Sequence, residues 1–71
     1  MSIYSDVKEL ERIDAPWGRE VRLQEVEIDG GLRILRVRIR EGRRFTDLEL
    51  TREKAIEVGA AIVAWGREAG D

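Results

Sequence analysis

The sequence contains no cysteine and no histidine, and these two absences exclude several kinds of site. A chain without cysteine has no disulfide, no thiol nucleophile and no thiolate ligand for an iron–sulfur cluster. A structural zinc site needs cysteine or histidine ligands, and the serine and threonine hydroxyls have no histidine to activate them. We therefore expect no catalytic residue, no metal site and no cofactor, and the protein is predicted not to be an enzyme.

Long apolar segments are also missing. No run approaches the roughly 18 residues of a membrane-spanning helix. The first 14 residues are polar and acidic, whereas a secretory signal has a basic start followed by an apolar stretch. Together with the lack of cysteine, which agrees with a reducing compartment, these features predict a cytoplasmic protein with no membrane partner.

A chain of 71 residues is short enough to be one domain, residues 1–71. Folding of so small a domain buries only about 60% of the surface of the unfolded chain. Small domains commonly add disulfides, a metal or a second copy of themselves, and the first two are excluded here. We therefore expect self-association, and a homodimer is the simplest form of it.

Basic charge is concentrated in one part of the chain, although the net charge is only −2. Residues 31–44 hold six arginines against one glutamate, a local balance of +5, and the rest of the chain holds 7 basic against 14 acidic residues. The arginines coincide with the clearest strand pattern, residues 32–40, in which apolar and basic side chains alternate with the period of two of a β-strand. Leu35, Val37 and Ile39 occupy one face of this strand, and Arg36, Arg38 and Arg40 occupy the other.

Two turn signals extend this strand into an antiparallel sheet over residues 19–50. Asp29-Gly30-Gly31 follows the β-branched segment 19–28, and Glu41-Gly42 precedes the alternating segment 43–50. A two-residue turn at Glu41-Gly42 predicts that Arg40 lies opposite Arg43, Arg38 opposite Phe45 and Arg36 opposite Asp47.

The leading segment, residues 1–14, has two interpretations. The spacing of Ile3, Val7, Leu10 and Ile13 suits one face of a helix, but the segment from Val7 to Ile13 also suits an extended edge strand. Pro16 and Gly18 then interrupt regular structure. We expect Trp17, between them, to fold onto the sheet.

Residues 51–67 are predicted to form a helix, with Thr51 as its N-cap. The apolar and small residues of this helix fall within one half of the helical wheel, and we call them the apolar stripe: Ala55, Ile56, Val58, Gly59, Ile62, Val63, Trp65 and Gly66. The stripe is expected to pack on one face of the sheet, called here the apolar face: Val21, Leu23, Leu35, Val37, Ile39, Leu48 and Leu50. The predicted fold is α+β, a small twisted antiparallel sheet of three or four strands with one C-terminal helix packed on one face (β-β-β-α).

The opposite, arginine face of the sheet is a candidate anion or nucleic-acid site. Guanidinium groups bind phosphates and aromatic rings stack on bases in single-strand binders. The candidate residues are Arg36, Arg38, Arg40, Arg44 and Phe45. The simpler interpretation is a solvated face neutralised by cross-strand ion pairs such as Arg36–Asp47 and Arg40–Glu20.

A three-residue turn at Asp29-Gly30-Gly31 predicts an apolar patch on this same arginine face, formed by Val26, Ile28, Leu32 and Ile34. Exposed apolar clusters usually mark interfaces, so the patch is a candidate dimer contact. Two alternatives remain: a β-bulge near Gln24 and Glu25 that rotates the strand, or cover from the leading segment.

Two stretches carry a resemblance to known proteins: residues 15–21 (APWGREV) and residues 31–46 (GLRILRVRIREGRRFT). They resemble a family of short proteobacterial proteins known only as a domain of unknown function, and the likeness covers most of residues 7–66. Over residues 32–66, the strands leading into residues 48–56 (LELTREKAI) resemble the positive-cofactor-four type of single-strand-binding domain. The second likeness implies a dimeric curved sheet followed by a helix.

The sequence thus favours a non-enzymatic binding or assembly module, acting through protein contacts as a homodimer. The alternative is single-stranded nucleic-acid or anion binding through the arginine face.

Overall fold

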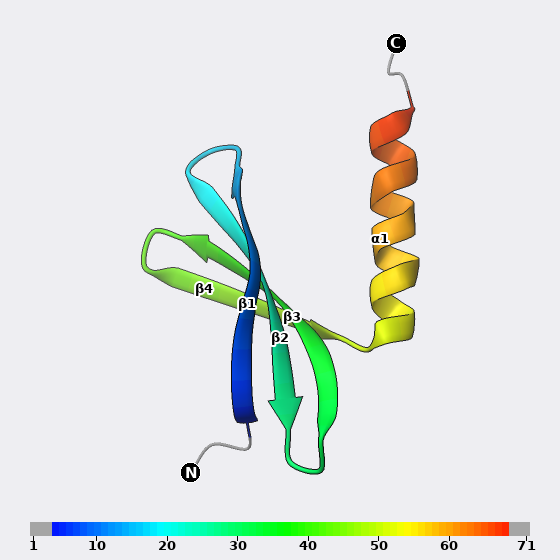
Figure 1. Cartoon of the computed structure of the whole chain (residues 1–71). Helices are drawn as coiled ribbons and strands as arrows, with labels where there is room; N and C mark the ends of the chain where they lie inside the picture. The colour runs from blue at the N-terminus through cyan, green and yellow to red at the C-terminus, as the bar shows by residue number, and fades with distance from the viewer. Residues whose placement is uncertain (1–3, 69–71) are drawn as a thin grey trace.

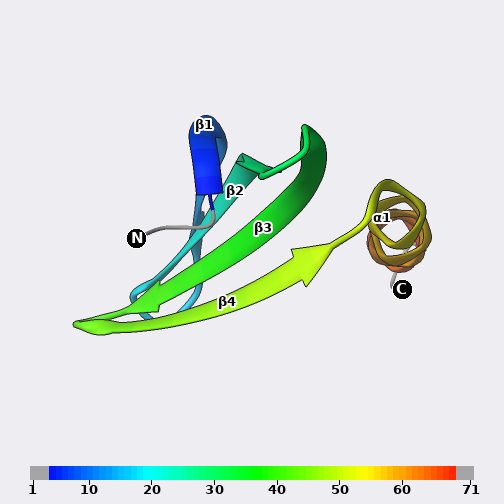
Figure 2. The same cartoon turned by 90° about the horizontal axis from the view of Figure 1, so that it is seen from below.

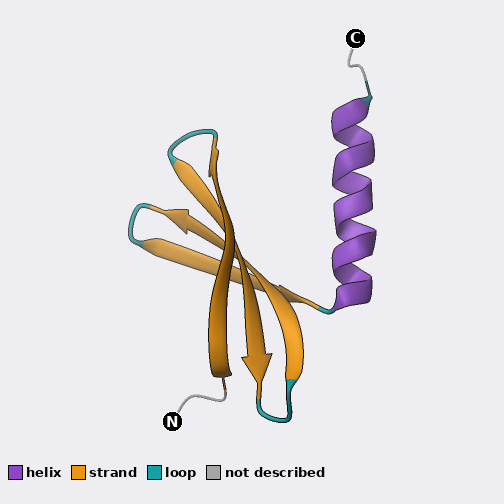
Figure 3. Ribbon diagram, in the orientation of Figure 1, coloured by secondary structure: helices purple, strands orange, loops and turns teal. Residues whose placement is uncertain are grey.

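The computed structural model describes residues 4–68, which form a four-stranded antiparallel sheet followed by one helix (Figures 1 and 3). The elements are β1 (Tyr4–Ala15), β2 (Arg19–Ile28), β3 (Leu32–Glu41), β4 (Arg44–Leu50) and α1 (Arg52–Arg67). The strands lie side by side in chain order, β1-β2-β3-β4. The predicted α+β class is confirmed. The sheet has four strands, where the sequence predicted three or four.

The leading segment is a strand, which decides between its two interpretations. β1 pairs with β2 from Tyr4 opposite Ile28 to Ala15 opposite Arg19. Its register shifts between Tyr4 and Asp6 and again between Glu9 and Glu11, so the edge strand carries two irregularities. Such irregularities and a high density of charge are common devices for keeping an edge strand from pairing with other chains. Ile3, part of the helical interpretation, lies outside the described residues.

The β3–β4 turn lies one residue later than predicted, and this shifts the register by two residues. Glu41 pairs with Arg44, so Gly42 and Arg43 form the turn. Gly42 has a φ of +63°, which the first central residue of a tight hairpin turn of this kind requires. As a result Arg40 lies opposite Phe45, Arg38 opposite Asp47 and Arg36 opposite Glu49. The predicted partners Arg43, Phe45 and Asp47 were each wrong.

The division into two faces is confirmed. Because side chains alternate along a strand, residues that pair across strands share a face. Val37 pairs with Leu23 and with Leu48, which places all three on the apolar face. Arg38 pairs with Arg22 and Asp47 on the arginine face.

The helix does not pack on the sheet, and this part of the predicted architecture was wrong. Both views show α1 beyond the end of β4, over neither face of the sheet (Figures 1 and 2). None of its described residues is buried. Thr51 caps the helix as predicted, its Oγ1 accepting a hydrogen bond from the Lys54 backbone N–H at 3.2 Å. Thr51 is also the only residue between β4 and α1, and this link is shorter than the two to six residues that usually return a helix onto its own sheet.

The most buried side chains all lie on the arginine face. Val26 is 0% exposed, and Glu20, Gln24 and Arg36 are also buried. Pairing assigns all four to this face, where long side chains of neighbouring strands cover one another. The buried side chains of this structure are therefore largely polar and lie on the arginine face, whereas the apolar face is left uncovered.

Candidate functional site

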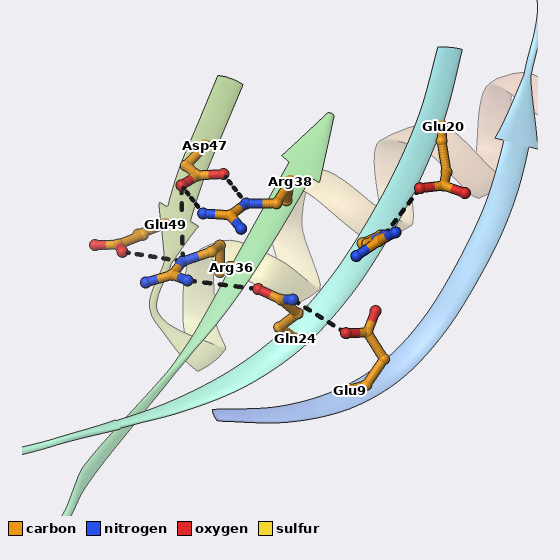
Figure 4. A network of polar contacts seen from close by, with 8 residues as sticks. Glu9, Glu20, Gln24, Arg36, Arg38, Asp47 and Glu49 are labelled. Carbon is orange, nitrogen blue, oxygen red and sulfur yellow. Dashed lines mark hydrogen bonds and ion pairs between the residues drawn. The ribbon is translucent and has the colours of Figure 1, made fainter. Parts of the chain in front are cut away.

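A polar network crosses the four strands on the arginine face, with Arg36 at its centre (Figure 4). The Arg36 side chain is one-tenth exposed, and its Nε lies 3.6 Å from Oε2 of Glu49 and 4.0 Å from Oδ2 of Asp47. Its Nη1 donates to Oε1 of Gln24 at 3.5 Å, and Gln24 donates from Nε2 to Oε1 of Glu9 at 3.1 Å. The network thus joins β1 to β4 through alternating donors and acceptors.

Arg38 is held by the strongest pair on this face. Its Nε and Nη2 donate to the two carboxylate oxygens of Asp47 at 2.8 and 2.9 Å, a two-point contact. The hydrogen bond from Arg38 holds the pKa of Asp47 below its usual value, and the same bond raises the pKa of Arg38. The guanidinium carbon also lies 5.1 Å from the centroid of the Phe45 ring, within cation–π distance.

Glu20 gathers three arginines around one buried carboxylate. Its oxygens lie 2.8 Å from Nε of Arg22, 3.1 Å from Nε of Arg12 and 3.5 Å from Nε of Arg40. The hydrogen bond from Arg22, joined by the charges of all three arginines, lowers the pKa of Glu20. Of these contacts, the sequence predicted only the Arg40 pair. The Arg12 contact requires β1 to be a strand, which sequence patterning left undecided.

The structure brings together four of the five predicted anion-binding residues. Arg36, Arg38, Arg40 and Phe45 share the arginine face, and each of the three arginines has an acidic neighbour within 4.0 Å. Arg44 pairs with Glu41 on the other face and is therefore separate from them. The geometry is that of a face whose positive charge is largely neutralised.

The candidate dimer patch lies on the arginine face, as predicted. Val26 pairs with Ile34 and Ile28 with Leu32, so the turn has the predicted three residues. Pairing between β2 and β3 is regular throughout, so the alternative of a bulge that rotates β2 near Gln24 and Glu25 is wrong. The irregularity beside Gln24 lies in β1, between Glu9 and Glu11. Val7 of β1 lies opposite Val26, so the leading segment does flank the patch. Of the four patch residues only Leu32 is widely exposed.

A larger apolar surface lies elsewhere. The apolar stripe of α1 is open to solvent, with Ile56 73% and Trp65 77% exposed. On the sheet, Leu48 of the apolar face is 51% exposed, and the other members of that face are half-buried. A groove of about 290 Å³ lies between the first turns of α1 and the sheet, and its apolar lining includes Leu10, Leu35 and Ile56. Trp17, expected to fold onto the sheet, is instead 85% exposed with a φ of +61° in the β1–β2 turn.

Residues 4–68 contain neither a cluster of metal-binding side chains nor a membrane-spanning helix. Over this range no group of three or more acidic side chains is placed to hold a metal ion. Nor is any helix within the described range long and apolar enough to cross a membrane.

Residues 4–68 match the model of a protein family described as a family of unknown function (DUF6967). The chain belongs to this family. The match spans the whole described sheet and helix, and it confirms the resemblance to an uncharacterised domain. Membership in DUF6967 brings no activity, ligand or site residue with it, so the function has to be argued from the geometry. No curated protein and no solved structure gave a significant match.

Proposed function

We propose that this DUF6967 protein is a non-enzymatic assembly module that works as a homodimer. The observation that carries the proposal is the uncovered apolar surface of a single chain, on the sheet and on α1 together. Contiguous apolar surface of this kind usually marks a protein–protein contact.

The overall dimensions support the same conclusion. The accessible surface is 5934 Å², whereas a compact monomer of 8.2 kDa exposes about 4,500 Å² by the scaling for monomeric proteins. The radius of gyration is 14.0 Å, against about 11 Å for a compact chain of 71 residues. The excess of roughly 1,400 Å² per chain would give a dimer interface of roughly 2,800 Å², within the range of obligate homodimers.

Sedimentation equilibrium tests the proposal. We expect twice the chain mass of 8.2 kDa at micromolar concentration. Leu48→Glu, which puts a charge on the apolar face, should shift the protein toward monomer. The matched control is Phe45→Glu, because Phe45 is on the same strand, is 52% exposed and faces the opposite side. A chain-mass particle at high micromolar concentration would overturn the proposal.

The same experiment tests the candidate dimer patch with a separate variant. If Val26, Ile28, Leu32 and Ile34 form the dimer contact, Leu32→Glu should dissociate the dimer and Leu48→Glu should not. The reverse result would place the contact on the apolar face.

Binding of single-stranded nucleic acid is a second candidate, favoured by the β3–β4 turn. Arg43 and Arg44 form no ion pair with any residue in the range 4–68. The Phe45 ring next to them in the chain is 52% exposed, on the opposite face of β4 from Arg44. With two free arginines rather than the four predicted from the sequence, we expect log K for oligo-dT to change with log salt at a slope of about −1.4. Arg44→Ala should halve that slope, whereas Arg36→Ala should leave it unchanged. Absence of binding at low salt, measured by fluorescence anisotropy, would remove this candidate.

A further inference from the structure

Resting on the proposed homodimer, we infer that α1 of each copy packs on the apolar face of the other copy's sheet. The occupant of each apolar face is thus the helix of a second copy of this chain, and the exchange is reciprocal.

The link between β4 and α1 is a single residue. Leu50 ends the strand, Arg52 begins the helix, and Thr51 between them has an extended backbone with φ −72° and ψ 169°. The helix therefore lies beyond the end of β4 and over neither face of its own sheet (Figures 1 and 2). A hinge too short to let an element fold back on its own chain favours exchange of that element between copies.

The apolar stripe of α1 and the apolar face of the sheet are similar in length. A helix of 16 residues is about 24 Å long, and a strand of 10 residues is about 33 Å long. One helix therefore covers most of the length of β3 at the centre of the apolar face. Only the first turns of α1 approach this face, at the groove lined by Leu10, Leu35 and Ile56. Beyond this groove no residue of α1 covers the apolar face within residues 4–68.

Gly59 lies in the apolar stripe, where its missing side chain has an energetic cost. Glycine inside a helix costs about 1 kcal/mol relative to alanine. A Cβ built at Gly59 meets nothing within 4 Å, so no contact among residues 4–68 of one chain accounts for the glycine. Close approach of a second copy's sheet to the helix backbone accounts for it.

Cross-linking between two single-cysteine variants tests the exchange directly. The natural chain has no cysteine, so each introduced thiol is unique. Leu48→Cys, on the apolar face, and Ile62→Cys, at the centre of the stripe, are unfolded together, refolded and treated with a short bismaleimide. We expect the dominant product to join position 48 of one copy to position 62 of the other.

The other outcomes separate the exchange from the proposed function. Dominant 48–48 or 62–62 products from a particle of dimer mass would overturn the exchange and leave the homodimer standing, with sheet against sheet or helix against helix. A particle of chain mass without cross-links would overturn both.

Lengthening the hinge gives an independent readout. Eight glycine and serine residues inserted between Leu50 and Thr51 should let α1 reach its own sheet at high effective concentration, giving a folded monomer. The matched control inserts the same eight residues between Gly30 and Gly31, at the far turn, and should remain a dimer. A hinge-lengthened protein that dimerises as tightly as the control would overturn the exchange.

Discussion

At the scale of single residues, the arginines act mainly as structural groups. Arg36 lies among Gln24, Glu49 and Asp47 on the most buried part of the sheet. A guanidinium in such a position is stabilising only while its acidic and amide partners remain in place. The arginine-rich strand is thus explained by cross-strand pairing before any ligand is invoked.

The structural role of Arg36 predicts that replacing it destabilises the fold more than replacing Arg43 in the neighbouring turn. Arg36→Ala removes the central donor of the network and should lower the free energy of unfolding by about 2–3 kcal/mol. Arg43→Ala, at the exposed turn, should change it by less than about 0.5 kcal/mol. Urea denaturation of the two variants measures the difference. Equal costs would contradict the structural role of Arg36.

Glu20 predicts a pH dependence of stability. Its pKa in the folded protein is lowered from the usual 4.5 by the Arg22 hydrogen bond. At a pH between the two values the unfolded chain binds more protons, so acidification favours unfolding. The contribution of Glu20 to the free energy of unfolding is complete above pH 4.5 and is lost as the pH falls through its lowered pKa in the folded protein. Glu20→Gln should therefore flatten the decline in stability below pH 4.5, and curves that stay parallel to the wild type would contradict this role.

Some of these residue contacts followed from sequence and others did not. The pair of Glu20 with Arg40 is predictable, because the glycine-rich turn at residues 29–31 sets the β2–β3 register. The residues predicted directly opposite Arg36 and Arg38 on β4 were wrong by two residues, because the alternation of side chains is the same for both registers. The predicted Arg36–Asp47 ion pair is nevertheless present, at 4.0 Å, as a diagonal contact. Only the backbone requirement for a positive φ at Gly42 distinguishes them.

At the scale of elements, the strands and the helix were more predictable than their arrangement. The period of two along residues 32–40 and the cap at Thr51 are local signals, and local contacts decide them. Whether residues 4–15 form a strand depends on β2 as a neighbour. The position of α1 depends on the single-residue link to β4. The amphipathic stripe predicts that the helix is covered by an apolar surface, but it does not distinguish the sheet of its own chain from the sheet of another copy.

Gly59 provides a prediction for α1 as an element. If α1 made no contact at this position, Gly59→Ala should stabilise the helix by about 1 kcal/mol, because alanine has the higher helix propensity. In the exchanged dimer the added methyl meets the second copy's sheet, and we expect weaker dimerisation instead. Ala60→Gly, one position along, serves as the control for propensity alone. Tighter dimerisation of Gly59→Ala in sedimentation experiments would contradict close approach at this position.

At the scale of the whole molecule, one chain forms a thin, single-layered structure. Its extents are 49 × 30 × 15 Å, and Val26 is the only apolar side chain buried within the described residues. Stable domains bury apolar surface between two layers of secondary structure. The missing second layer is, in our account, supplied by the helix of the other copy, so folding and assembly are one process.

The most direct test of this coupling is the concentration dependence of unfolding. If the folded state exists only as a dimer, its apparent stability should rise by about 1.4 kcal/mol for each tenfold increase in protein concentration. Urea unfolding followed by circular dichroism at 2, 20 and 200 µM protein, values chosen to span roughly the range in which obligate dimers exchange with unfolded chains, measures this. We predict midpoints that rise steadily across the series. Midpoints that coincide at all three concentrations, with a cooperative transition, would show that a single chain is stable alone and would contradict the account.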